Sequence, residues 1–340
     1  MRVTQRDIAR LAEVSQATVS RVLSGDVRVE HEIRDRVLAV MQQKNYQPDV
    51  RARALRNQKS GLIGLVIKRP QGGIANDPFY ANLISYLVEE LSGRDYHLCV
   101  DVASDEFYQV AIYDELLRTR RVDGLILVES EAADDRIRRL QAEGFPFVLL
   151  GNPLHFAEVH SVDNDNVIAA EEVTNHMIEQ GYKRVGFLGA RAGITVSDDR
   201  IAGYQRALRG KQAEHLVYHS AFGSESSRRL ATDILKSSER PDALVVLDDF
   251  MAFGVATAAR DLGLQIPRDL GIASFNDTSL CEMIGGGLTS VNLNIQGLVS
   301  KAVHRLSKII DDKPILTDRR IIVPTTLTVR SSSLRSEVLK

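Results

Sequence analysis

The sequence predicts a small all-α unit at the N-terminus, followed by a larger α/β core of two doubly wound parallel-sheet lobes. The first sixty residues contain three short segments whose apolar residues recur at helical spacing. From Gly61 onward, short apolar runs alternate with helical stretches, which is the rhythm of a parallel sheet covered by helices on both faces. A length of 340 residues suggests two or three domains.

The first two helices are predicted from their N-caps and apolar spacing. Thr4 is an N-cap candidate with Asp7 three residues later, so we expect a helix from Gln5 to Leu11. After a turn at Glu13 and Val14, we expect Ser15 to cap a second helix. The inner side of this helix is expected to comprise Val14, Thr18, Val19 and Val22, and its outer side Gln16, Ala17, Ser20 and Arg21.

A third helix is predicted in EIRDRVLAVMQQKNY, with Ile33, Val37, Val40 and Met41 inside. Three small helices with a tight turn between the first two are typical of a helix-turn-helix headpiece, which we expect over residues 1–47. A bundle whose polar outer face is merely solvated is the alternative. The residue types favour nucleic acid, because Gln and Arg pair bidentately with adenine and guanine edges, and because Thr4, Ser15 and Ser20 can donate to phosphates.

Charge is distributed unevenly along the chain. Residues 1–60 carry 12 Lys and Arg against 7 Asp and Glu, whereas the remainder carries 31 against 38. The overall net charge of -2 therefore hides a basic N-terminus, which suits a partner that carries phosphates.

The run VTQRDIARLAEVSQATVSRVLSG closely resembles the headpiece of the LacI/GalR family of bacterial transcription repressors. One departure is Glu13, where the family usually has Gly in the turn, so we expect a left-handed backbone conformation there at some cost. The resemblance implies a set of DNA contacts in the headpiece: Thr4, Ser15, Gln16, Ala17, Thr18, Ser20, Arg21, Asn45 and Tyr46.

Residues 48–60 read by themselves as a basic linker with weak helical character, too short for a helix that is stable alone. The resemblance implies a sharper role, a hinge helix that folds when two copies meet in the minor groove. The family's ARxL element is ARAL here, which places Leu55 as an apolar wedge in the central base step beside Arg53 and Ala54.

The core is predicted from seven apolar runs that read as strands. They fall into two groups, so two units of alternating strands and helices are expected in series, with a boundary near Ser161 to Asn166. The runs are GLIGLVI, YHLCVDVA, DGLILVE, FPFVLLG, KRVGFLGA, DALVVLD and LGIASFN.

The core resembles the periplasmic-binding-protein-like sensor of the same family, in which two lobes enclose a small ligand and the chain crosses between the lobes three times. The implied core spans residues 61–340, with one lobe at about 61–160 and 293–323 and the other at about 161–292 and 324–340. The motifs that carry the resemblance are VDNDN, GYKRVGFLG, SDDRIAGYQRAL, PDALVVLDDFMAFGVATAARDLGLQIPRDLGIASFND, LTSV and VPTTLTVRSS.

Ligands of open α/β sheets lie beyond the carboxyl ends of the strands, so the residues that follow the strands are candidates for effector binding. Asp77, Phe79 and Tyr80 lie after the first strand, where an aromatic ring can stack on a sugar or a base. For Tyr80, a place in the core of the next helix is an equal alternative. The further candidates are Asn152, Arg200, Phe222, Asp249 and Asn276.

The resemblance implies particular roles for some of these candidates. Arg200 matches the family's ligand-clamping arginine, whose planar fork suits hydroxyl pairs or a carboxylate. Phe222 matches an aromatic residue that lines some family pockets. Asn276 stands where the family usually has Asp, and an amide donates as well as accepts hydrogen bonds.

No motif or spacing indicates catalysis, a cofactor or a metal. The histidines are dispersed, and Cys99 and Cys281 lie far apart in apolar segments, so both are expected to be small buried hydrophobes. Asp248 and Asp249 are adjacent, but neighbours at a strand end point in different directions and are not expected to share chemistry.

We therefore expect a DNA-binding repressor of carbohydrate genes that binds a pseudo-palindromic operator as a homodimer and is released by a sugar-like effector. A regulator that needs a purine or another metabolite as corepressor is the alternative. A transport-type solute receptor would share the core, but it predicts a signal peptide and no basic headpiece. A cytoplasmic protein is expected, and the tail SSSLRSEVLK is too short for a coiled coil, which favours a dimer over a tetramer.

Overall fold

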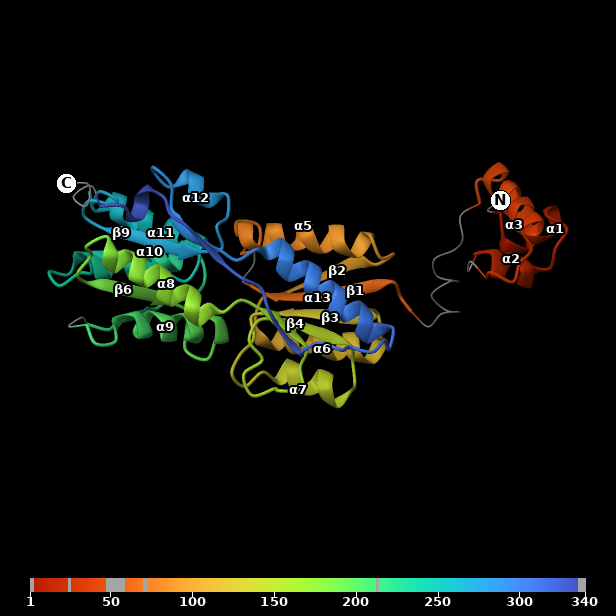
Figure 1. The fold of residues 1–340 in the computed structure, drawn as a ribbon, viewed down its shortest axis with the longest axis horizontal. Coiled ribbons are helices and arrows are strands. Elements are labelled where there is room, and N and C mark those ends of the chain that lie inside the picture. The colour runs from red at the N-terminus through yellow and green to blue at the C-terminus, as the bar shows by residue number, and fades with distance from the viewer. Residues whose placement is uncertain (1–2, 24–25, 47–58, 70–72, 212–213, 336–340) are drawn as a thin grey trace. The chain divides into compact units, whose positions relative to one another are not determined.

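The chain divides into two compact units, residues 1–60 and residues 61–340. The computed structural model (Figure 1) describes residues 3–23, 26–46, 59–69, 73–211 and 214–335. No helix within these ranges combines the length and apolarity that a membrane span requires.

The N-terminal unit is a bundle of three helices, α1 (Gln5–Leu11), α2 (Gln16–Leu23) and α3 (His31–Gln43). The Thr4 hydroxyl accepts from the Asp7 amide at 3.3 Å while the Asp7 carboxylate accepts from the Thr4 amide at 3.0 Å, so the expected capping box is present. The buried residues of the bundle are Ile8, Ala9, Ala12, Val19, Val22 and Val37.

The turn between α1 and α2 confirms the expectation for Glu13, whose φ is 53°. A side chain in this left-handed region is strained, and Gly is the residue that adopts it freely. The Ser15 hydroxyl then accepts from the Thr18 amide at 3.0 Å, so Ser15 caps α2 as expected.

The first lobe of the core is built on a six-stranded sheet in the order β11-β5-β4-β3-β1-β2, with all neighbouring strands parallel. Its strands are β1 (Leu62–Lys68), β2 (His97–Ala103), β3 (Gly124–Val128), β4 (Phe147–Leu150), β5 (Ser161–Asp163) and β11 (Arg320–Ile322).

Helices cover both faces of this sheet. On one face lie α5 (Pro78–Ser92) and α13 (Ile295–Ile310), which run side by side in Figure 1 and bury residues such as Leu83 and Val299 against β1 and β3. On the other face, α6 (Glu106–Thr119) and α7 (Asp135–Ala142) pack against the opposite side chains of the same strands. Strands buried on both faces explain why β1 and β3 are continuous apolar runs.

The second lobe repeats this design in the order β12-β10-β9-β8-β6-β7. Its parallel strands are β6 (Val185–Gly189), β7 (Leu216–His219), β8 (Ala243–Val246), β9 (Gly271–Phe275) and β10 (Thr289–Asn292), and β12 (Thr326–Thr328) pairs antiparallel with β10. One face carries α8 (Asn166–Glu179) and α9 (Thr195–Leu208), and the other carries α10 (Ser224–Lys236), α11 (Asp249–Asp261) and α12 (Leu280–Met283).

The fold class predicted from the sequence is therefore confirmed, and each of the seven predicted runs contains a strand. Both sheets have the same doubly wound order, β2-β1-β3-β4-β5 and β7-β6-β8-β9-β10. The switch point, where the strand order reverses, therefore lies between β1 and β3 in the first sheet and between β6 and β8 in the second. Five strands were not predicted, because three or four residues of mixed polarity show no clear period: β5, β7, β10, β11 and β12.

The chain passes between the lobes after β5, after β10 and after β11. Ser161 pairs with β4 and β11 in the first sheet, so the first passage begins after Asp163, which ends β5. Asn164 joins all three passages: its buried amide donates to the Leu293 carbonyl at 3.1 Å and to the Val323 carbonyl at 2.8 Å.

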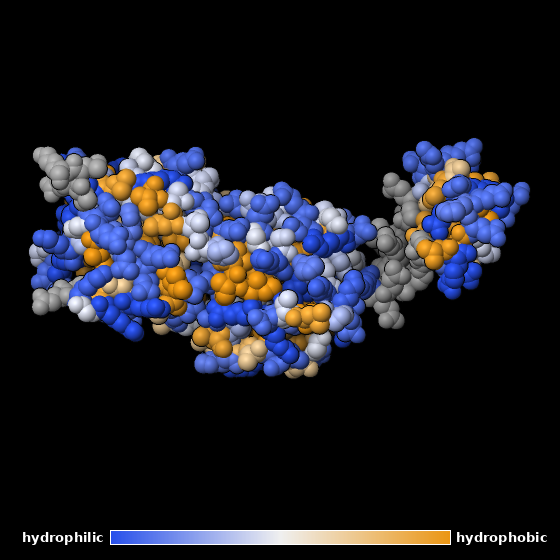
Figure 2. All heavy atoms as spheres, viewed as in Figure 1, coloured by the Kyte–Doolittle hydropathy of each residue, from blue (hydrophilic) through white to orange (hydrophobic). Residues whose placement is uncertain are grey.

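Hydrophilic side chains cover most of the face drawn in Figure 2, and the apolar side chains gather there in separate patches. Cys281 is buried as expected, whereas Cys99 is only half-buried because it lies on β2, the edge strand of its sheet.

Candidate functional site

Helix α2 presents a polar outer face. Val19 and Val22 are buried against the other two helices, while Gln16, Ala17 and Arg21 are exposed. The Gln16 side chain is held by neighbours on α1, because its oxygen accepts from the Arg6 guanidinium at 3.4 Å and its nitrogen donates to Gln5 at 3.5 Å. These two hydrogen bonds with α1 therefore fix the orientation of the Gln16 side chain.

The other headpiece residues of the predicted set lie around this face. Thr4 and Ser15 cap α1 and α2, and Thr18 shares a hydrogen bond of 2.9 Å with Ser15. Ser20 is half-buried. After α3, Asn45 is exposed in a left-handed conformation, and Tyr46 packs against the headpiece core. The predicted hinge contacts Arg53, Ala54 and Leu55 lie outside the described residues.

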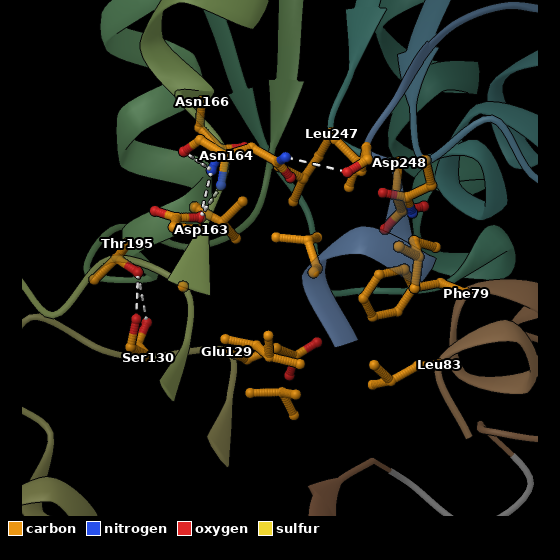
Figure 3. Close-up of a pocket in the computed structure, with 18 of the residues that line it drawn as sticks. Phe79, Leu83, Glu129, Ser130, Asp163, Asn164, Asn166, Thr195, Leu247 and Asp248 are labelled. Atoms are coloured by element: carbon orange, nitrogen blue, oxygen red, sulfur yellow. Dashed lines mark hydrogen bonds between the residues drawn. The ribbon is translucent and has the colours of Figure 1, made fainter. Parts of the chain in front are cut away.

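The core encloses a cavity of about 120 Å³ between its two lobes. The carboxyl ends of β1 and β3 lead into it from one lobe and that of β8 from the other, so the switch points of both sheets face the same space. Figure 3 shows Phe79 and Leu83 on one side of the cavity, with Asp163 and Thr195 on the opposite side.

Arg200 is the most deeply buried guanidinium in the wall, with 4% of its surface exposed. Its Nε donates to Asn166 Oδ1 at 2.9 Å and its Nη1 to the Leu247 carbonyl at 2.5 Å, and it lies 4.0 Å over the Phe275 ring. Its remaining N–H donors make no hydrogen bond with the described residues. Burial lowers the pKa of Arg200 to about 10, so the group stays charged near neutral pH.

A second guanidinium, Arg69, closes the cavity from the end of β1. Arg69 forms a bidentate ion pair with Glu129, and the buried Tyr80 hydroxyl donates to the same carboxylate at 2.7 Å. The Arg69 guanidinium also lies 4.4 Å over the ring of Phe222, which belongs to the other lobe. Although burial opposes it, the Glu129 charge raises the pKa of Arg69 above its usual value.

Three carboxyl groups in the wall hold protons more tightly than usual. Burial raises the pKa of Asp77 and of Asp163 to about 6. Burial, followed by the charge of Asp77, raises the pKa of Asp248 to about 7. Near neutral pH, each of these three carboxyl groups is protonated in a fraction of the molecules, and the protonated form can donate a hydrogen bond as well as accept one.

Five of the eight predicted effector residues line the cavity, namely Asp77, Phe79, Arg200, Phe222 and Asn276. The other three, Tyr80, Asn152 and Asp249, do not. Tyr80 is fully buried in the core of the first lobe. This is the alternative that the sequence left open for Tyr80, a place in the core of the helix after the first strand. The Asn152 amide donates to Asp199 at 2.8 Å and so joins the two lobes beside the cavity.

The predicted position of Asp249 in the cleft is wrong, because Asp249 does not line the cavity. Its carboxylate accepts from Ser274, Ser290 and Thr278 inside the second lobe, where it joins the ends of β9 and β10 to α11. Its neighbour Asp248 points into the cavity instead, because successive residues at a strand end face opposite sides.

The sequence reasoning also missed Arg69, Glu129, Asp163 and Asn166. Arg69 and Glu129 each stand directly after a strand, and Asp163 ends one, so the strand-end rule that selected the other candidates applies to them equally. No group of three or more potential metal ligands lies together in the described part of the chain.

Comparison with known proteins decides the family. Residues 4–49 match the model described as bacterial regulatory proteins, lacI family, and residues 174–333 match the periplasmic binding protein-like domain. The catabolite control protein A of Staphylococcus epidermidis is 30% identical over 98% of this chain and 100% of that protein. The chain belongs to the LacI family of bacterial transcription regulators.

Two further comparisons cover nearly the whole chain. The ribose operon repressor of Halalkalibacterium halodurans is 30% identical over 98% of both proteins. The crystal structure of the lac repressor dimer bound to operator and the anti-inducer ONPF has a TM-score of 0.84 and 22% identity, covers 98% of this chain and 100% of that one, and shows the shared fold. This LacI-family chain is thus a DNA-binding transcription regulator. The family is not enzymatic, and its DNA-binding headpiece separates it from solute receptors that do not bind DNA.

Proposed function

We propose that this LacI-family regulator is a cytoplasmic repressor of carbohydrate-metabolism genes. It binds a pseudo-palindromic operator as a homodimer, and a small sugar-like effector releases it. The H. halodurans relative is a ribose operon repressor, which supports the link to sugars. Two-fold symmetry of the protein requires two half-sites in the DNA, which is the reason for a palindrome.

In this proposal α2 lies in the major groove. Gln16 and Arg21 hydrogen-bond to base edges, and the small Ala17 allows close approach. Thr4, Ser15, Thr18, Ser20, Asn45 and Tyr46 position the headpiece on the phosphates. Arg53 and Ala54 accompany Leu55 into the minor groove, where Leu55 kinks the central base step.

The observation that carries the effector proposal is the chemistry of the interlobe cavity. The buried Arg200 fork has unused donors, and Asp77, Asp163 and Asp248 offer carboxyl groups in the same wall. Convergent donors and acceptors beside aromatic rings such as Phe79 suit the hydroxyl groups and apolar faces of a sugar ring. A ligand held by both lobes changes how far they close, and this closure couples the cavity to the DNA-binding segments.

A corepressor of the purine type is the second candidate. The Asn276 amide lines the cavity and both donates and accepts, as the edge of a base requires, and Phe79 supplies a ring for stacking. The sign of the effector response separates the two candidates, because an inducer weakens DNA binding whereas a corepressor strengthens it.

Selection of DNA from a random pool tests the DNA half of the proposal. We expect a symmetric site, and we expect Arg21→Ala to lose selectivity at one base of each half-site by about 1 to 3 kcal/mol. Arg36→Ala removes an equal charge from the exposed face of α3 and is the control for sequence-independent loss. An asymmetric or random selected pool would contradict the proposal.

Arg200→Lys tests the effector half, with sugars, sugar phosphates and purines as the panel. Lysine keeps the charge but removes the planar fork, so we expect at least tenfold more effector to be needed while DNA affinity without effector stays unchanged. Arg260→Lys, on the exposed surface of α11, is the matched control. An unchanged effector response in Arg200→Lys would remove Arg200 from the site.

A further inference from the structure

The cleft between the lobes contains a second, larger chamber of about 610 Å³. The first lobe contributes the ends of β1 and β3 and the start of α6 to its walls, and the second lobe contributes residues 190–194 and 219–222. Arg69, Val128, Glu129 and Phe222 line both spaces, so this outer chamber adjoins the inner cavity along a shared wall.

The inner cavity is small for a complete ligand site. At about 120 Å³ it lies below the range of about 300 to 1,000 Å³ that is usual for small-molecule pockets, whereas the outer chamber lies within that range. An effector longer than one ring therefore has room only if it extends past the Arg69 and Phe222 pair into the outer chamber.

The charges of the outer chamber favour a neutral ligand. Its walls hold the basic residues Lys68, Arg69, Arg136 and Arg191, and these are already paired. Lys68 Nζ lies 3.1 Å from Glu131, Arg191 contacts the same carboxylate at 2.7 Å, and Arg136 contacts Asp134 at 2.6 Å. A charged ligand would have to break such pairs and leave a charge uncompensated, whereas hydroxyl groups can bind beside them.

Gln109 is the group in this chamber that lacks a partner. It lies in the first turns of α6, has 5% of its surface exposed and lines the outer chamber, yet its side-chain amide makes no hydrogen bond with the described residues. Its polar atoms are open to the chamber rather than sealed from solvent, so water can hydrogen-bond to them until a ligand displaces it. A ligand with hydroxyl groups would satisfy both its donor and its acceptor.

We infer that the outer chamber is the subsite for a second sugar ring, hydrogen-bonded by Gln109, and that the effector is a neutral disaccharide or longer oligosaccharide. This inference rests on the proposed function, because it assigns the size and charge of the effector that enters the same cleft. Its first ring occupies the inner cavity beside Arg200.

Calorimetric titration of the full-length protein tests the inference with matched sugars. The probes are glucose, mannose and xylose, each compared with its own disaccharides: maltose and cellobiose, mannobiose, and xylobiose. We expect one disaccharide to bind at least tenfold more tightly than its monosaccharide. Equal affinity of the two would overturn the second subsite while leaving a sugar-responsive repressor intact, and binding of none of these sugars would overturn both the subsite and the proposed sugar effector.

Gln109→Met then assigns the role of the amide. Methionine has nearly the same length without the polar head, so we expect the disaccharide to lose about tenfold in affinity, the monosaccharide to lose none, and the melting temperature to stay the same or rise. Gln141→Met, an exposed exchange on α7, is the control. A fall in melting temperature with no change in disaccharide affinity would show that Gln109 is structural and would overturn its assignment.

Discussion

At the scale of single residues, the cavity concentrates acids that the fold keeps from ionising freely. Asp77, Asp163 and Asp248 all have raised pKa values because burial disfavours their charged forms. Carboxyl groups of this kind reduce stability near neutral pH. A ligand that accepts or donates hydrogen bonds to these groups would offset part of this unfavourable free energy.

Asp248→Asn should remove part of the stability loss that comes from burying an ionised carboxylate. The unfolded chain releases the Asp248 proton near pH 4, but the folded protein holds it until the pKa of about 7, so stability falls as pH rises through this window. We expect the variant to be more stable than the parent by about 1 to 2 kcal/mol at pH 8 and by little at pH 4. Urea unfolding at several pH values measures this difference.

Asp248 also caps helix α11, so the experiment needs a control for the effect of the exchange on a helix cap. The Asp248 carboxylate accepts from the Met251 amide as the N-cap of α11, a role that Asn performs equally well. Asp105→Asn makes the same exchange at the N-cap of α6, where the Asp105 side chain is exposed. A gain in Asp105→Asn equal to that in Asp248→Asn would contradict the account.

Sequence reasoning placed its effector candidates within a residue or two of the side chains that line the interlobe cavity, but it did not always choose the lining side chain itself. Of the residues that the strand-end rule selected, Asp77 and Asn276 line the cavity, whereas Asp249 does not and its neighbour Asp248 does. A shift of one position at a strand end turns a side chain to the other face, and only the surrounding contacts determine which of two adjacent carboxylates enters the cleft.

At the scale of elements, the sequence predicted most where the pattern was long. Continuous apolar runs such as β3 and β8 are buried on both faces, and the caps of α1 and α2 were readable from Thr4 and Ser15. The passages between the lobes were less readable, because a three-residue strand such as β5 has no period to detect.

Asn164 connects the three passages between the lobes through its side-chain hydrogen bonds. Asn164→Ala leaves the buried Leu293 and Val323 carbonyls without their donor, so we expect a loss of about 2 to 3 kcal/mol in the free energy of unfolding. Asn175→Ala removes an exposed hydrogen bond to Lys211 and should cost little. Denaturant unfolding compares the two variants, and equal losses would mean that Asn164 does not join the passages energetically.

At the scale of the whole molecule, the first lobe carries an exposed apolar surface suited to a second copy of the chain. It comprises Val100 and Val102 on the edge strand β2, which lie on the face of the sheet that α5 covers, and the exposed Val88 on α5. An exposed edge strand that bears apolar residues promotes aggregation unless a partner covers it. In a two-fold dimer, the same surface of the second copy would cover it.

Val102→Lys tests this surface. Lysine places a charge in the proposed contact, so we expect sedimentation to find the variant less associated than the parent chain at the same concentration, with operator affinity reduced in parallel. Leu316→Lys changes a residue that is 92% exposed in a loop outside this surface and should leave the dimer intact. A dimer that survives Val102→Lys unchanged would place the interface elsewhere.

The most direct test of the central claim is the fluorescence anisotropy of the full-length protein on its selected palindrome, measured across salt concentrations with and without each sugar of the panel. The account predicts that log affinity falls linearly with log salt, with a slope of about -0.9 per neutralised phosphate. It also predicts that one sugar weakens binding by about 5-fold to 150-fold, the usual size of allosteric coupling. Affinity that does not distinguish the palindrome from random DNA, or that no sugar lowers, would contradict it.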